Sequence, residues 1–273
     1  MPRSSDARPI AVFDSGVGGL TVLSEIHRRL PRESTVYLGD NARAPYGPRP
    51  AEEVRRYTLE CLDWLLAADP KVVVLACNTA SAQALDDVRA SSAVPVMGVI
   101  RPGAVAAAAA TRSGQVGVVA TAGTVRSEAY PAAIAEADPQ VRVVQQACPE
   151  LVPLVESGQI AGRAVEDAVA GYLGALLERA PNIDTLLLGC THYPPLRPVF
   201  SRALGDGVAV VDSAFTTALA LEDLLDALRA RAPAGTPTSR IATTGAVEAF
   251  EVVAARVFGT GLPAVEAASV GSH

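Results

Sequence analysis

The sequence has 273 residues, of which 49% are hydrophobic and 19% are charged, a composition typical of a globular protein with one large domain or two modest ones. Its net charge is −6 and it contains no run of Lys or Arg, which argues against a nucleic-acid-binding protein. The first residues contain no apolar signal-peptide region, and no apolar stretch is long enough to span a bilayer. We therefore expect a cytoplasmic enzyme or binding protein that does not contact membranes.

Strand-like and helix-like segments alternate along the chain. The expected strands are 9–13, 35–39, 71–76, 94–98, 115–120, 141–145, 184–189 and 208–212. The expected helices are 18–30, 50–67, 80–90, 102–111, 125–137, 149–157, 162–179, 195–204, 213–231 and 244–257. Because the strands are nearly continuous apolar runs between helices, we predict an α/β fold of mostly parallel sheets with helices on both faces.

The order of these elements is duplicated. Each half contains three predicted strands in succession. The third strand of the first half ends in ACNT (76–79), and the third strand of the second half ends in GCTH (189–192). We predict two similar domains related by a pseudo-twofold axis, with an active site in the cleft between them. The expected first domain is discontinuous and comprises 1–99 plus 208–273, and the second comprises 100–207.

Cys77 and Cys190 each stand at the carboxyl end of a predicted parallel strand, where open α/β sheets bind ligands. A helix that follows directly offers N–H groups to an anion and lowers the pKa of a thiol. One such cysteine alone is more often a small buried residue. The matched pair, with polar residues after each member, favours two reactive thiols that face each other across the cleft.

Three further segments carry candidate residues. The glycine-rich turn DSGVGG (14–19) places Asp14 at a strand end, where it is either a helix cap or a group that binds substrate ammonium or orients a base. The turn-rich GDNARAPYG (39–47) is either a surface loop or a loop that closes over substrate. His192 lies two residues after Cys190 and is suited to proton transfer, although a lone histidine is more often structural.

The composition also limits the cofactors. Lys71 is the single lysine and it opens a strand, so a Schiff-base lysine for pyridoxal phosphate is almost excluded. The four cysteines form no CxxC pair and the three histidines form no ligand motif, which makes a metal site a weak interpretation. We expect neither a cofactor nor a metal, and we interpret Cys61 and Cys148 as structural.

Four motifs in this order and spacing resemble the glutamate racemase family: FDSGVGGLTV, YLGDNARAPYG, VLACNTASA and LLLGCTHYP. CPELVPLVE (148–156) is similar to the family as well. The resemblance extends from about residue 9 to about residue 258. The two cysteine motifs together are highly specific, whereas the glycine loop alone would not be.

The resemblance implies a cofactor-independent racemase that interconverts L- and D-glutamate with two opposed thiols and supplies D-glutamate for peptidoglycan. It implies that Cys77 deprotonates D-glutamate with help from Asp14, and that Cys190 deprotonates L-glutamate with help from His192. Glu156 is a further candidate on the Cys190 side, and Glu150 competes for that place. The implied substrate contacts are Asp14, Ser15, Tyr46, Gly47, Asn78, Thr79, Thr191 and His192. The family commonly forms homodimers, so a homodimer is possible here.

Three other functions compete with this interpretation. The first is an aspartate racemase of the same superfamily, whose second motif resembles Gly-Cys-Thr-Glu, whereas His192 occupies the last position here. The second is a non-catalytic amino-acid-binding protein with inert cysteines. The third is a thiol redox protein in which Cys77 and Cys190 form a reversible disulfide.

Overall fold

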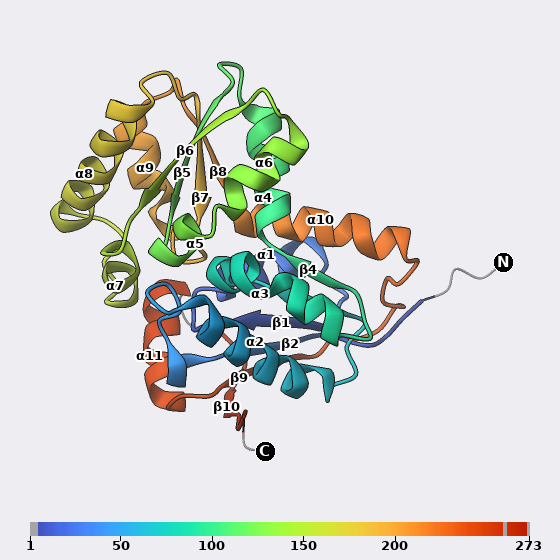
Figure 1. Ribbon diagram of the computed structural model, residues 1–273. Coiled ribbons are helices and arrows are strands. Elements are labelled where there is room, and N and C mark those ends of the chain that lie inside the picture. The colour runs from blue at the N-terminus through green and yellow to red at the C-terminus, as the bar shows by residue number, and fades with distance from the viewer. Residues whose placement is uncertain (1–4, 259–260, 272–273) are drawn as a thin grey trace.

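The computed structural model describes residues 5–258 and 261–271 of the chain. These residues form two parallel sheets with helices on both faces, and the predicted α/β fold is confirmed (Figure 1). None of the helices within these ranges is long and apolar enough to cross a membrane.

The first sheet has six strands within the described residues, in the order β10-β9-β2-β1-β3-β4. Their bounds are β1 (Ile10–Asp14), β2 (Thr35–Gly39), β3 (Val72–Leu75), β4 (Val96–Gly98), β9 (Ser239–Thr243) and β10 (Val265–Ala267). One face packs on α1 (Leu20–Arg29), α10 (Ser213–Ala227) and α11 (Val247–Phe258). The other face packs on α2 (Ala51–Leu66) and α3 (Asn78–Ser91). Both faces are buried, which explains the continuous apolar runs of β1 and β3.

The second sheet has four strands in the described part of the chain, in the order β6-β5-β7-β8. Their bounds are β5 (Gln115–Ala120), β6 (Arg142–Ala147), β7 (Thr185–Gly189) and β8 (Ala209–Asp212). One face packs on α7 (Leu151–Glu156), α8 (Arg163–Arg179) and α9 (Arg197–Leu204). The other packs on α4 (Ile100–Ala110) and α6 (Ala129–Ala137). The short elements are α5 (Ala122–Arg126) and the 3-10 turns η1 (Asn41–Arg43) and η2 (Pro194–Leu196).

Helix α10 lies where the two halves meet. It contacts α1 of the first half and α4 of the second, and Figure 1 shows it in orange beside both. The chain then returns to the first sheet through β9 and β10, which pair in parallel with β2 and with each other. The halves are therefore joined both by the segment after β4 and by α10.

Three details differ from the sequence-based expectations. The strand at 208–212 pairs with β7 in the second sheet, so it does not return to the first half as the predicted boundary at 207 required. Strands β9 and β10 were not expected, because their runs are short and partly polar. The predicted helix 125–137 is broken into α5 and α6 at Glu128, whose φ of 54° lies in the left-handed region.

Candidate active site

A cavity of about 690 Å³ lies between the two halves, at the carboxyl ends of strands from both sheets. Both Cys77 and Cys190 line it. The other predicted site residues that line it are Ser15, Tyr46, Gly47, Asn78, Thr79, Glu156, Thr191 and His192. Residues from the two halves of the duplicated sequence therefore meet at one cavity, as the predicted cleft required.

A larger cavity of about 1080 Å³ lies apart from the predicted site residues, between the ends of α1 and α10. Its charged walls pair with one another, since Glu222 pairs with Arg29 and Arg231, and Arg231 also pairs with Asp226. These wall charges are thus engaged within the protein, and none of the predicted site residues lines this cavity.

Cys77 is the N-cap of α3, and its sulfur accepts a hydrogen bond from the Ala80 N–H at 3.4 Å. Its thiol donates to Ser15 Oγ at 3.3 Å. Burial, together with the negative charge of Asp14, raises the pKa of Cys77 to about 12. The expectation that the helix N-terminus lowers this pKa is wrong, because desolvation and the nearby carboxylate outweigh the hydrogen bond from the Ala80 N–H at the start of α3.

Asp14 ends β1 directly behind the cavity wall. Its Oδ2 accepts from the Gly16 N–H at 2.9 Å, and its Oδ1 accepts from Thr191 Oγ1 at 3.4 Å. Burial raises the pKa of Asp14, and His192 and these hydrogen bonds oppose that rise. Because Thr191 follows Cys190, this buried carboxyl group connects the first strand to the second cysteine motif.

Cys190 follows β7, and its sulfur lies 3.9 Å from His192 Nδ1. The other ring nitrogen of His192 lies 2.9 Å from Glu156 Oε1. Burial disfavours the charged ring, but the hydrogen bonds to Cys190 and Glu156 outweigh it and raise the pKa of His192 to about 10. Glu150 instead accepts a hydrogen bond from Tyr172 at 3.1 Å, so Glu156 is the carboxylate that contacts His192.

Asn78 and Thr79, the polar residues that follow Cys77, are buried at the start of α3. Thr79 Oγ1 lies 2.9 Å from Thr121 Oγ1, which links the start of α3 to the cap of α5. Asn78 Nδ2 donates to Tyr130 Oη at 2.7 Å, whereas Asn78 Oδ1 is buried without a partner among the described residues. The two halves of the protein thus exchange hydrogen bonds at the cavity wall.

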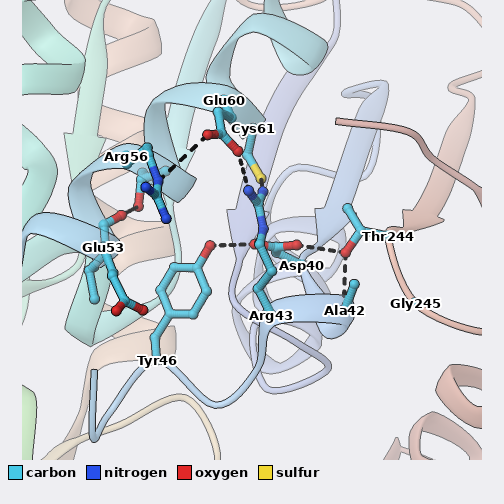
Figure 2. A network of polar contacts seen from close by, with 12 residues as sticks. Asp40, Ala42, Arg43, Tyr46, Glu53, Arg56, Glu60, Cys61, Thr244 and Gly245 are labelled. Atoms are coloured by element: carbon cyan, nitrogen blue, oxygen red, sulfur yellow. Dashed lines mark hydrogen bonds and ion pairs between the residues drawn. The ribbon is translucent and has the colours of Figure 1, made fainter. Parts of the chain in front are cut away.

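The loop after β2 forms another wall and is held from behind by Asp40 (Figure 2). Asp40 Oδ2 accepts from Tyr46 Oη at 2.5 Å and from Arg43 Nε at 2.7 Å, while Thr244 Oγ1 donates to Oδ1 at 2.6 Å. Arg43 also pairs with Glu60. The Tyr46 hydroxyl is therefore occupied within the protein, and what this loop offers the cavity is its backbone and ring surface.

Gly18 explains why the turn before α1 is rich in glycine. A Cβ at this position would lie 2.5 Å from His192 Cε1 and Nδ1 and would also collide with Thr191 Oγ1. The glycine loop of the first half therefore packs directly against the second cysteine motif. The sequence shows the glycine-rich turn, but its contact with His192 depends on the tertiary structure.

Sequence reasoning missed several residues that line the cavity, among them Thr121, Asn41 and Val152. The duplication contained a signal for Thr121, because it follows the first strand of the second half as Asp14 ends the first strand of the first half. Cys148, interpreted as structural, also lines the cavity. All four cysteines are free, and the described residues contain no group of three or more His, Cys, Asp or Glu placed to hold a metal ion.

Comparison with known proteins agrees with this arrangement. Residues 10–221 match the model of the Asp/Glu/Hydantoin racemase family. Glutamate racemase from Lactiplantibacillus plantarum is 46% identical over 248 residues, which is 90% of each chain. The crystal structure of a glutamate racemase isoform from Bacillus anthracis is 42% identical with a TM-score of 0.92, covering 96% of this chain and 97% of that one.

A third relative is the crystal structure of glutamate racemase from Francisella tularensis in complex with D-glutamate. It is 32% identical with a TM-score of 0.89 and covers 97% of this chain and 98% of that one. These matches extend over nearly the full length of both chains. The protein therefore belongs to the Asp/Glu/Hydantoin racemase family and, within it, to the glutamate racemases.

Proposed function

We propose that the protein interconverts L- and D-glutamate, using Cys77 and Cys190 as the two acid–base groups. The observation that carries this proposal is that both thiols, from equivalent positions of the duplicated chain, line one cavity with different polar partners. The relative from Francisella tularensis, solved with D-glutamate, supports the choice of substrate. Relatives named glutamate racemase over 90% of this chain support the reaction.

For L-glutamate, the reaction begins at Cys190. Its thiolate takes the α-proton, and the C–H electron pair stays on the α-carbon as a carbanion. The Cys77 thiol then protonates the opposite face and becomes the thiolate, which yields D-glutamate with no net gain or loss of protons. With a pKa of about 10, His192 is a cation at neutral pH and stabilises the Cys190 thiolate next to it.

For D-glutamate, the same steps run in reverse and begin at Cys77. With a pKa of about 12, this thiol is protonated at neutral pH. The substrate brings an ammonium group, whose positive charge offsets the nearby carboxylate of Asp14 and favours the Cys77 thiolate. Asp14 therefore assists Cys77 by attracting the substrate ammonium, and its burial places that charge where water screens it little.

The remaining predicted residues bind the substrate in this proposal. Thr79 and Thr191 are buried hydroxyl groups beside the two thiols, and the N-terminus of α3 lies at Asn78. Hydrogen-bond donors held in place before the reaction stabilise the charge that develops on the substrate carboxylate as the α-proton leaves. Ser15, Tyr46 and Gly47 complete the wall from the first half.

The wider role is part of the same proposal. D-glutamate made by this reaction supplies peptidoglycan synthesis in the cytoplasm, as the identity of the relatives supports. A homodimer stays a prediction. Aspartate remains the alternative substrate, and His192 after Cys190-Thr191 favours glutamate over it.

The deciding experiment follows deuterium incorporation from D₂O into the α-position of each enantiomer, with racemisation measured by circular dichroism. The wild type should exchange and racemise both enantiomers of glutamate. Cys77→Ala should exchange L-glutamate only, Cys190→Ala should exchange D-glutamate only, and neither should racemise. Near-normal racemisation by either variant contradicts the two-thiol mechanism.

The same assay separates the competing functions. Faster turnover of aspartate than of glutamate would overturn the proposed substrate. Tight binding of glutamate by the wild type without exchange would indicate a binding protein. Activity that depends on an oxidised form of the protein, rather than on full reduction, would favour the redox alternative.

A further inference from the structure

Tyr130 is a fully buried residue of α6 that lies between the two cysteine motifs. Its hydroxyl oxygen accepts a hydrogen bond from Nδ2 of Asn78, the residue after Cys77. Its ring covers Gly189, the residue before Cys190, so closely that a Cβ on Gly189 would lie 2.7 Å from Cε2 of the ring. One side chain of the second half therefore contacts the neighbours of both proposed acid–base groups.

We infer that Tyr130 is a positioning residue that fixes the Asn78 amide so that its free oxygen faces the substrate. This inference rests on the proposed racemisation of glutamate. The Tyr130 hydroxyl holds the nitrogen end of the amide at 2.7 Å, and Ser213 Oγ lies 3.4 Å from the same nitrogen. Two hydroxyl groups thus occupy one end of the amide and leave the other end for the cavity.

The free end of the amide needs a hydrogen-bond donor. Asn78 lines the cavity and is 2% exposed, and its Oδ1 has no partner among the residues that the structure describes. A buried carbonyl oxygen without a donor is unfavourable, so a ligand that supplies one gains affinity. The ammonium group of glutamate is such a donor, and both enantiomers carry it.

Tyr130 acts through geometry in this arrangement and not by exchanging a proton. Burial raises the pKa of its hydroxyl above the ordinary value, although the hydrogen bond from Asn78 opposes the rise. The hydroxyl is therefore neutral at neutral pH. Its removal should leave the shape of the pH–rate profile unchanged, unlike the removal of an acid or a base.

The test is Tyr130→Phe, which keeps the ring on Gly189 and deletes only the hydroxyl oxygen. We expect KM for both enantiomers to rise roughly 3- to 10-fold, the loss that follows removal of one neutral hydrogen bond, with little change in kcat. Because the two enantiomers have equal free energy in solution, kcat/KM must fall by the same factor in both directions.

A matched control is Tyr172→Phe, which deletes the same atom in the same half. The Tyr172 hydroxyl bonds to Glu150 and does not line the cavity, so KM should stay at the wild-type value. A double-mutant cycle completes the test. If Tyr130 acts by orienting Asn78, adding Tyr130→Phe to Asn78→Ala should not raise KM further.

The outcomes separate this inference from the proposed function. An unchanged KM in Tyr130→Phe overturns the positioning role while leaving the racemase proposal intact. An equal effect of Tyr130→Phe with and without Asn78→Ala also overturns it, because the hydroxyl would then act through another group. A wild-type protein that does not racemise glutamate overturns both. Urea unfolding of each variant shows that the measured protein is folded.

Discussion

Replacement of Gly18 by alanine should disable the site through one added methyl group. The new Cβ would lie 2.5 Å from two ring atoms of His192, and Thr191 Oγ1 is equally close. Since non-bonded carbon contacts settle near 3.5–4.0 Å, the two segments must separate by about 1 Å. The His192 ring cannot yield freely, because Glu156 holds it from the other side at 2.9 Å. A 1 Å misplacement in an active site costs roughly 100-fold in rate.

The assay is racemisation of both enantiomers by circular dichroism, together with urea unfolding. We expect kcat/KM to fall about 100-fold in each direction. Overpacking costs about 1–3 kcal/mol, which leaves a protein of ordinary stability folded. The control is Gly174→Ala in α8, where an added Cβ meets no atom within 4 Å, and this variant should keep full activity. Wild-type kcat/KM in the Gly18 variant would refute the close approach to His192.

Other changes test the charged groups. Glu156→Gln should lower the pKa of His192 and move the alkaline limb of the rate profile to lower pH; an unmoved limb contradicts the contact between them. The stability that His192 contributes is fully present below its unfolded pKa of about 6.5 and is lost as pH rises to about 10, so unfolding of this variant should depend less on pH across that window. Lys71→Met should lower the free energy of unfolding by roughly 3–5 kcal/mol, because Glu33 stays buried without its partner; urea unfolding that matches the wild type would contradict it. Arg43→Ala should raise KM by loosening the cavity loop that it holds from behind, and an unchanged KM would show that the loop does not need it.

Most of the fold follows from local patterns in the sequence. β3 is apolar throughout and lies between α2 and α3, and β1 is apolar from Ile10 to Phe13 and leads into α1, which is sufficient to predict buried parallel strands. β8 shows the limit of this reasoning. The run at 209–212 predicts a strand, but the sheet that it joins depends on its pairing with β7, which no local pattern specifies. β9 pairs with β2 although two of its five residues are polar and incompletely buried.

The site shows the same division between local and tertiary information. The positions of Cys77 and Cys190 follow from the repeated pattern of a buried strand that ends at a cysteine, and both thiols line the predicted cavity. The raised pKa of Cys77 does not follow from this pattern, because the shift depends on burial and on the charge of Asp14, which lies on another strand. Tyr130 gave no signal at all, since it lies in an alanine-rich helix with no polar motif beside it.

The two cysteines proposed as acid–base groups occupy equivalent positions in the duplicated sequence, but their surroundings differ. Cys77 contacts a neutral hydroxyl, Ser15, and its raised pKa means that it carries a proton at neutral pH. Cys190 instead lies beside the cationic ring of His192, which Glu156 helps to keep charged. In the proposed reaction of L-glutamate, Cys77 gives a proton and Cys190 takes one. Each turnover exchanges these states, so the enzyme that has just made D-glutamate is already in the form that accepts D-glutamate. Release of product must therefore be followed by redistribution of the proton between the two thiols before the next L-glutamate can react. Rates of deuterium exchange from solvent, measured at high turnover, would report that step.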